Sequence, residues 1–298
     1  MKVRIQPEAP QHGPHYKMAK RFLRWGLTVL VVVIATVKLV SVCRFYYVAE
    51  ELPPYTISQP RHQDDTLRMI IIGDSWADYH TSLQADTMIA NTAKRIYSHP
   101  VKSISRGKRG AQSKEIYYFM FSEKTTEHSY EPDRCTQPLI EDHPDYCVVF
   151  AGINDVTFMK PTSYYAKNMK HIIRLLLHNG IKPVVMEIPL VHFKYPYKGM
   201  RLRDKLYYWT TSALLSTLHN KGEDYQEALN KILSDTHLKD SVLYIAAKQW
   251  NPKGSIDTTM FLSDRLHLNL AGYQKLDSCI ITEIIHDYHK RSHNPTHQ

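Results

Sequence analysis

The sequence predicts an α/β protein: a three-layer α/β/α sandwich with a five-stranded parallel sheet, preceded by one N-terminal transmembrane helix. Three observations predict this. Short apolar stretches, typical of strands buried on both faces, alternate with segments of helical period. Two of the apolar stretches end in glycine followed by polar residues, as strands do where a parallel sheet carries a site. A single long apolar run follows a basic N-terminal cluster.

The N-terminal part predicts a membrane anchor. Residues 1–24 hold six Lys or Arg and a single acidic residue, and the predicted anchor of residues 25–48 contains an apolar run over residues 25–42 that is interrupted only by Lys38. Its length approaches the roughly 20 residues that a spanning helix needs, and Trp25 and the Phe45-Tyr46-Tyr47 group suit the two interfaces. By the positive-inside rule, residues 1–24 form a cytoplasmic tail, and the chain after about residue 50 is exported to the periplasm or cell surface. A cleaved signal peptide and a buried soluble helix are the alternatives.

Composition excludes several other classes. The net charge of +9 lies largely in the N-terminal cluster, and the remaining basic residues are scattered, so we expect no nucleic-acid partner. The 43% hydrophobic content of 298 residues suffices for one main domain. In an exported domain Cys135 and Cys147 would be able to form a disulfide, whereas burial as small apolar residues is the alternative for Cys147 and for Cys279.

After a proline-containing linker over residues 49–67, the domain of residues 68–298 alternates strands and helices. A glycine-bearing turn follows the second strand, an irregular loop covers residues 125–144, and Asn269 is the expected N-cap of the last helix. Residues 190–223 mix basic and aromatic side chains and are longer than a connection needs, which indicates an insertion over one face. Strands are expected at residues 68–72, 101–105, 146–150, 183–188 and 242–245, and helices at about 78–96, up to 121, 165–176, 225–233 and 270–289.

The end of the first strand presents a serine. Four apolar residues lead into Gly73-Asp74-Ser75, where the glycine permits a tight exit and Ser75 falls at a helix start with free backbone N–H groups beside it. A nucleophilic serine is displayed in this way. The alternative is a serine that only caps the helix.

A base and an orienting carboxylate stand late in the chain. Asp264 and His267 are three residues apart, so that in a loop Asp264 can fold back to the imidazole Nδ1 while Nε2 faces a serine. The alternative for this pair is a solvated loop with a helix-capping network.

Four blocks together resemble the SGNH/GDSL hydrolase family. They comprise Gly73-Asp74-Ser75, Gly110 with Ser113, Gly152-Ile153-Asn154-Asp155, and Asp264-Arg265-Leu266-His267, and the resemblance runs from about residue 69 to the last helix. It implies a flavodoxin-like fold with no metal or organic cofactor. It also implies that Ser75 is the nucleophile, His267 the general base and Asp264 the orienting carboxylate, with an oxyanion hole formed by the N–H groups of Ser75 and Gly110 and the amide of Asn154.

Other polar residues are assigned to structure or left open. Asp74 and Asp155 are expected to bond to nearby turn backbone. The turn before Gly110 contains Arg106, Lys108 and Arg109, which raises an anionic substrate or partner as a hypothesis. The C-terminal histidines fit a solvated helix end and tail better than a metal site, because Pro295 interrupts them and no carboxylate or cysteine accompanies them: His286, His289, His293 and His297.

The sequence therefore predicts a membrane-anchored, extracytoplasmic serine esterase that acts through an acyl-enzyme, with removal of O-acetyl groups from a surface or cell-wall glycan as the expected reaction. One alternative is an acyltransferase or an accessory protein of polysaccharide O-acylation that works with a membrane acyltransferase. The other is a non-catalytic SGNH domain that binds a glycan or a partner through the 190–223 insertion.

Overall fold

The structure is a computed structural model, and its contacts divide the chain into two compact units, Met1–Tyr47 and Val48–Gln298. Each unit is described by itself. The residues that the structure describes are 14–45, 48–58, 61–82, 85–96, 100–121, 132–158, 160–189, 202, 222–253, 257, 259–264 and 266–293.

The first unit contains one helix, α1 (Pro14–Phe45). Its large apolar side chains are exposed, among them Phe22, Trp25 and Leu30. Within the described residues, no helix combines the length and the apolar character that crossing a bilayer demands. The membrane anchor therefore stays a prediction.

The second unit is built on a parallel sheet of five strands in the order β2-β1-β3-β4-β5. Strand β1 lies beside both β2 and β3, so that Gly73 at its end pairs with Gly107 on one side and Phe150 on the other. The predicted sheet is thereby confirmed. The strands are β1 (Leu67–Gly73), β2 (Val101–Gly107), β3 (Tyr146–Phe150), β4 (Lys182–Met186) and β5 (Leu243–Ile245).

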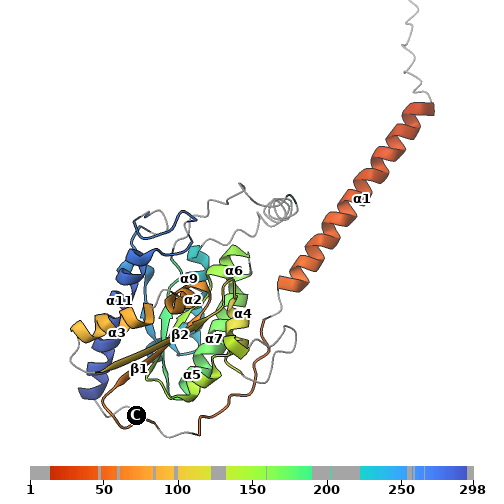
Figure 1. The fold of residues 1–298 in the computed structure, drawn as a ribbon. Coiled ribbons are helices and arrows are strands. Elements are labelled where there is room, and N and C mark those ends of the chain that lie inside the picture. Colours follow the sequence, from red (N-terminus) through yellow and green to blue (C-terminus); the bar gives the residue numbers. More distant parts are fainter. Residues whose placement is uncertain are drawn as a thin grey trace, which may run out of the picture. The chain divides into compact units, whose positions relative to one another are not determined.

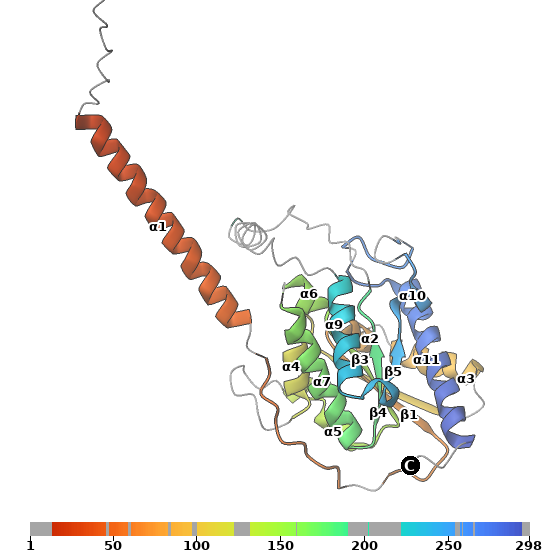
Figure 2. The same ribbon diagram turned by 180° about the vertical axis from the view of Figure 1, so that it is seen from behind.

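Helices cover both faces of this sheet (Figures 1 and 2), which gives the three predicted layers. Alternate strand residues point to opposite sides, so Ile70 and Val149 belong to one apolar core and Ile71 and Val148 to the other. The first core lies under α4 (Ser113–Phe119), α7 (Thr162–His178) and α9 (Gly222–Asp235). The second lies under α2 (Ser75–Ser82), α3 (Ala85–Ile96) and α11 (Leu270–His293).

Several short helices were not predicted. The helix expected at about 78–96 is two helices, α2 and α3, and the first of them begins at Ser75 itself. The loop expected at 125–144 contains a 3₁₀ turn and α5 (Gln137–Glu141), and α6 (Ile153–Thr157) and α10 (Ala247–Trp250) follow β3 and β5. Helices of four or five residues have too few turns to show a period in sequence. The predicted N-cap Asn269 is confirmed, since its side-chain oxygen accepts a hydrogen bond from the N–H of Gly272 at 3.0 Å.

The segment predicted as a linker is partly bound to the domain surface. The N–H of Ala49 donates to Asn168 at 3.0 Å, that of Leu52 to the Tyr117 hydroxyl at 2.9 Å, and that of Ile57 to Asn179 at 3.0 Å. Residues 48–58 thus form a strap, whose apolar side chains add to the first core. The predicted insertion at 190–223 lies outside the described residues except for residues 202, 222 and 223.

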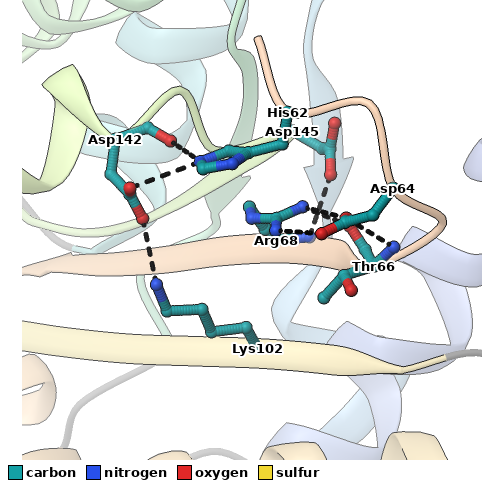
Figure 3. A network of polar contacts seen from close by, with 7 residues as sticks. All are labelled: His62, Asp64, Thr66, Arg68, Lys102, Asp142 and Asp145. Atoms are coloured by element: carbon teal, nitrogen blue, oxygen red, sulfur yellow. Dashed lines mark hydrogen bonds and ion pairs between the residues drawn. The ribbon is translucent and has the colours of Figure 1, made fainter.

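A polar network holds the amino-terminal edge of the sheet (Figure 3). Asp64 accepts two hydrogen bonds from the Arg68 guanidinium at 2.6 and 2.8 Å, while Asp145 accepts the Arg68 backbone N–H at 2.9 Å. Lys102 on β2 pairs with Asp142 at 3.2 Å. These contacts fix the start of β1. They lie at the amino ends of the strands, whereas Ser75 follows the carboxyl end of β1.

The cysteines do not form the disulfide considered above. Cys135 and Cys147 are free and buried, and Cys279 is free and half-buried. Burial raises the pKa of the Cys147 thiol far above its ordinary value. Cys147 points into the first core from β3, where it serves as a small apolar residue.

Candidate active site

Ser75 lies at the carboxyl end of β1 and is the first residue of α2. The turn needs glycine at position 73, because a Cβ there would lie 2.0 Å from the carbonyl oxygen of Phe150 on the neighbouring strand. The N–H of Asp74 donates to the same carbonyl at 3.0 Å. The serine is therefore presented by a backbone that is held rigidly between two strands.

His267 and Asp264 come late in the sequence but lie close to Ser75 in the structure. Asp264 Oδ1 accepts the backbone N–H groups of Leu266 and His267 at 2.9 and 3.0 Å, and Asp264 Oδ2 lies 2.7 Å from His267 Nδ1. His267 Nε2 lies 3.1 Å from Ser75 Oγ. With its Nδ1–H donated to the carboxylate, the imidazole presents an unprotonated Nε2 to the serine hydroxyl, as a general base does.

The loop that carries His267 is fixed by further contacts. Residues 261 and 268 form an antiparallel bridge, and the N–H of Leu262 donates to the His267 carbonyl at 2.8 Å. The Trp76 indole N–H donates to the carbonyl of Leu266 at 3.2 Å, which joins the residue after Ser75 to the residue before His267. Burial tends to raise the pKa of Asp264, but the hydrogen bonds from His267 and Leu266 outweigh it, and the pKa lies below its ordinary value. Asp264 is thus ionised near neutral pH.

The two other predicted site residues, Gly110 and Asn154, follow the neighbouring strands β2 and β3. The Asn154 side-chain Nδ2 donates to the carbonyl of Ala111 at 2.9 Å, which places the buried amide against the turn that contains Gly110. An amide nitrogen carries two hydrogens, so one remains for a ligand. Gly110 has φ of +79°, and a Cβ there would meet no heavy atom of the described residues within 4 Å. Glycine therefore permits this conformation and leaves its surroundings open.

Asp74 and Asp155 bond to the turns, as expected. Asp74 Oδ1 accepts the N–H of Trp76 at 2.9 Å, and Asp155 accepts both the N–H and the hydroxyl of Ser113 at 3.0 and 2.7 Å. Burial raises the pKa of Asp74 to about 7 and that of Asp155 to about 6. Ser113 accepts in turn a hydrogen bond from Asn168, the residue that holds the strap.

Sequence reasoning missed an aromatic neighbour of the base. The ring of Tyr79 packs edge-on against the His267 imidazole, with centroids 5.1 Å apart and planes at 70°. Tyr79 follows Ser75 by four residues, and side chains at this spacing share one face of a helix. That spacing is a signal only once the helix is known to begin at the serine.

A buried histidine–aspartate pair was also missed. His80 Nδ1 lies 2.6 Å from the carbonyl oxygen of Trp76, and its Nε2 lies 2.9 Å from Oδ1 of Asp277 on α11. Both side chains are almost wholly buried. Because a carbonyl only accepts, Nδ1 carries a hydrogen, and a second proton is shared between Nε2 and the carboxylate. The pair therefore joins α2 to α11.

A small cavity of about 20 Å³ lies beside Asp74 and Trp76. Asp74 and Trp76, the neighbours of Ser75, line it together with Phe150, Met186 and Trp250. Within the described part of the chain, no group of three or more His, Cys, Asp or Glu side chains is arranged to hold a metal ion.

Comparison with known proteins finds a matching family and similar solved structures. Residues 71–275 match the GDSL-like lipase/acylhydrolase family. Similar solved structures include a GDSL-like lipase from Bacteroides thetaiotaomicron (15% identity, 74% of this chain and 89% of that one, TM-score 0.49). They also include an acetylxylan esterase from Geobacillus stearothermophilus (15%, 73% and 93%, 0.47) and a psychrotrophic esterase from Pseudoalteromonas (15%, 78% and 100%, 0.47). No curated protein matches the chain.

The family match spans well over half of the chain, from the strand that leads into Ser75 to the helix that follows His267. The chain belongs to the GDSL-like lipase/acylhydrolase family, the SGNH/GDSL hydrolases, and is a serine hydrolase that acts on ester bonds.

Proposed function

We propose that Ser75, His267 and Asp264 are the catalytic residues of this esterase and that it removes acyl groups, acetyl above all, from a glycan outside the cytoplasm. The observation that carries the catalytic part is the continuous hydrogen-bonded array from Asp264 through His267 to Ser75 Oγ, with separations of 2.7 and 3.1 Å. Nucleophilic acyl transfer requires this order of groups.

In this mechanism His267 Nε2 accepts the Ser75 proton as Oγ attacks the acyl carbonyl carbon. The oxyanion that forms is held by the N–H groups of Ser75 and Gly110 and the second amide hydrogen of Asn154. His267 then donates its proton to the departing alcohol oxygen, which leaves an acyl-Ser75 ester. A water molecule, deprotonated by His267, hydrolyses that ester and restores the enzyme.

The test is hydrolysis of p-nitrophenyl acetate by residues 48–298. We expect turnover that Ser75→Ala lowers by roughly 10⁴- to 10⁶-fold. The matched control is Ser278→Ala, since the Ser278 hydroxyl only bonds to the Gln274 carbonyl on α11. Equal rates from the wild type and Ser75→Ala would refute the catalytic assignment and leave a binding domain as the function.

The glycan and its location rest on the N-terminal unit. The exposed apolar side chains of α1, preceded by a basic cluster, support a membrane anchor with the esterase domain on the far side. The full chain should remain in the membrane pellet after alkaline carbonate extraction, whereas residues 48–298 should not. Recovery of the full chain in the soluble fraction would remove the reason for an extracytoplasmic glycan. Analysis of products formed with a sugar acceptor distinguishes hydrolysis from acyl transfer.

A further inference from the structure

The basic turn before Gly110 divides into residues with different surroundings. The Arg106 guanidinium donates to the carbonyl of Cys135, and Lys108 lies over the Phe119 ring and 3.9 Å from Glu115. Arg109 differs from both, because its side chain is 59% exposed. Of the three, Arg109 is therefore the residue that can meet a ligand from solution.

Arg109 is held in a defined orientation beside the catalytic base. Its guanidinium carbon lies 4.6 Å from the centre of the Tyr79 ring, and its Nε donates to Asp78 at 2.6 Å. Asp78 also accepts a hydrogen bond from Arg134 at 3.1 Å. One aromatic ring, that of Tyr79, thus contacts the guanidinium and the His267 imidazole.

The remaining hydrogen-bond donors of Arg109 suit an oxyanion. Stacking on Tyr79 and the bond from Nε use one face and one edge of the planar group, and the described residues supply no partner for the two terminal nitrogens. Two parallel N–H groups match the two oxygens of a carboxylate or phosphate. The contacts with Tyr79 and Asp78 restrict the rotamers of Arg109 before an anion binds, so less side-chain entropy is lost on binding.

The position of Arg109 says which part of an ester it would meet. In the proposed reaction the alcohol oxygen leaves toward His267 Nε2, so the alcohol part of the ester lies on the imidazole side of Ser75. Tyr79 packs against the imidazole, and Arg109 lies over the Tyr79 ring, so both belong to that side. A substituent on the alcohol therefore approaches the guanidinium.

We propose that Arg109, oriented by Tyr79 and Asp78, is an anion-recognition residue that selects esters whose alcohol part carries a carboxylate or phosphate group. This rests on the proposed function, and it narrows the substrate class to O-acyl groups on acidic alcohols such as acidic sugars. Arg109 is a specificity residue and takes no part in bond making or breaking.

The test compares three acetate esters with the same aromatic core: 4-acetoxybenzoate, 4-acetoxyphenyl phosphate and the neutral methyl 4-acetoxybenzoate. We expect Arg109→Gln to lower kcat/KM for an anionic ester roughly ten- to a hundredfold more than for the neutral one. Arg109→Lys should keep part of the preference for anionic esters, since lysine retains the positive charge but lacks the two parallel N–H groups of the guanidinium. Because each variant is compared with wild type on the same esters, differences in intrinsic reactivity cancel.

Lys102→Gln is the matched control. Lys102 is also exposed and paired with a carboxylate (Figure 3), but it lies near the start of β2, whereas Arg109 follows the end of that strand. Its removal should leave the ratio of kcat/KM for each anionic ester to kcat/KM for the neutral ester at the wild-type value. A ratio that changes for the carboxylate alone, or for the phosphate alone, identifies which anion the site takes. Equal losses on all three esters with Arg109→Gln, or no loss, would overturn the inference.

Binding of the product separates this inference from the proposed reaction. Calorimetry should show 4-hydroxybenzoate binding wild type more tightly than its methyl ester, and Arg109→Gln should abolish that difference. If wild type hydrolyses none of the esters but shows this Arg109-dependent binding, the anion site stands and the esterase assignment fails. If it hydrolyses the neutral ester and neither anion depends on Arg109, the assignment stands and the anion site fails.

Discussion

Asp264 accepts three hydrogen bonds, two from backbone N–H groups and one from the imidazole of His267. The backbone bonds fix the carboxylate, and the third bond selects the tautomer of His267 that leaves Nε2 free to accept. The two functions of this carboxylate, holding the loop and orienting the base, are separable by substitution.

Asp264→Asn keeps an acceptor for the backbone but can bond the imidazole in the wrong tautomer. We expect kcat for p-nitrophenyl acetate to fall by about 10³- to 10⁴-fold, while the thermal unfolding midpoint changes by only a few degrees. Steady-state kinetics and thermal denaturation on the same preparation check this. An activity loss that always accompanies unfolding would indicate a purely structural carboxylate.

Asp74 gives the stability of the domain a pH dependence. Burial raises its pKa from 3.8 to about 7, so between these values the folded state holds a proton that the unfolded state has lost. The free energy of unfolding therefore falls as pH rises from about 4 to about 7 and levels off above. Asp74→Asn removes this contribution and can still accept the Trp76 N–H, so urea denaturation across this range should show a flatter profile. A profile as steep as that of wild type would contradict the burial argument.

At the scale of residues, the sequence pointed to the groups whose place at a strand end or spacing along the chain is visible in it, and it missed those that depend on three-dimensional packing. Ser75 and His267 were singled out as candidates, with catalytic roles that stay predictions, and the predicted reach of Asp264 to His267 Nδ1 is seen in the structure. Tyr79 and His80 were not, because an aromatic residue or histidine inside a helix gives no sign of its contacts. Arg109 was noted only as a charge, since its stacking requires the turn and α2 to be adjacent.

Between elements, the buried pair of His80 and Asp277 joins α2 to α11. Burial raises the pKa of Asp277 above its ordinary value, although His80 beside it acts in the opposite direction. Asp277 Oδ2 has no hydrogen-bond partner among the described residues. A buried pair of this kind contributes little net stability when intact, but removing one member leaves the other without compensation.

Asp277→Ala should lower the free energy of unfolding by about 3–5 kcal/mol. Replacing both members, His80→Leu with Asp277→Leu, should cost less than the single change, because no buried charge is then left alone. Urea denaturation of the two variants and wild type measures the difference. A double variant less stable than Asp277→Ala would mean that the bond from His80 to the Trp76 carbonyl outweighs the ionic pair.

At the scale of elements, apolar content predicted four of the five strands, since strands covered on both faces are apolar throughout. The strand at 101–105 was predicted instead from its alternation of apolar and polar residues. Apolar content was insufficient for the join between α2 and α3 and for α5, α6 and α10, whose few residues carry no period. The strap of residues 48–58 was missed for another reason. Its hydrogen bonds are made by backbone N–H groups, which every sequence has.

The whole molecule is two units, and the strap belongs to the second. Residues 48–298 should therefore fold without residues 1–47 and keep the unfolding midpoint of the domain. A chain that begins at residue 61 lacks the bonds from Ala49, Leu52 and Ile57 and the apolar contacts of the strap. We expect it to be less stable by roughly 3–5 kcal/mol, measured by urea denaturation. Equal stability of the two truncated chains would show that the strap is only loosely attached.

The bond between His267 and Ser75 spans 192 residues, and the one between His80 and Asp277 spans 197. Ser75 is therefore synthesised long before His267, with an interval of roughly 10–40 s at ordinary rates of translation. During this interval the serine is an ordinary hydroxyl. The cell is exposed to an active hydrolase only once α11 has been made and has closed the domain.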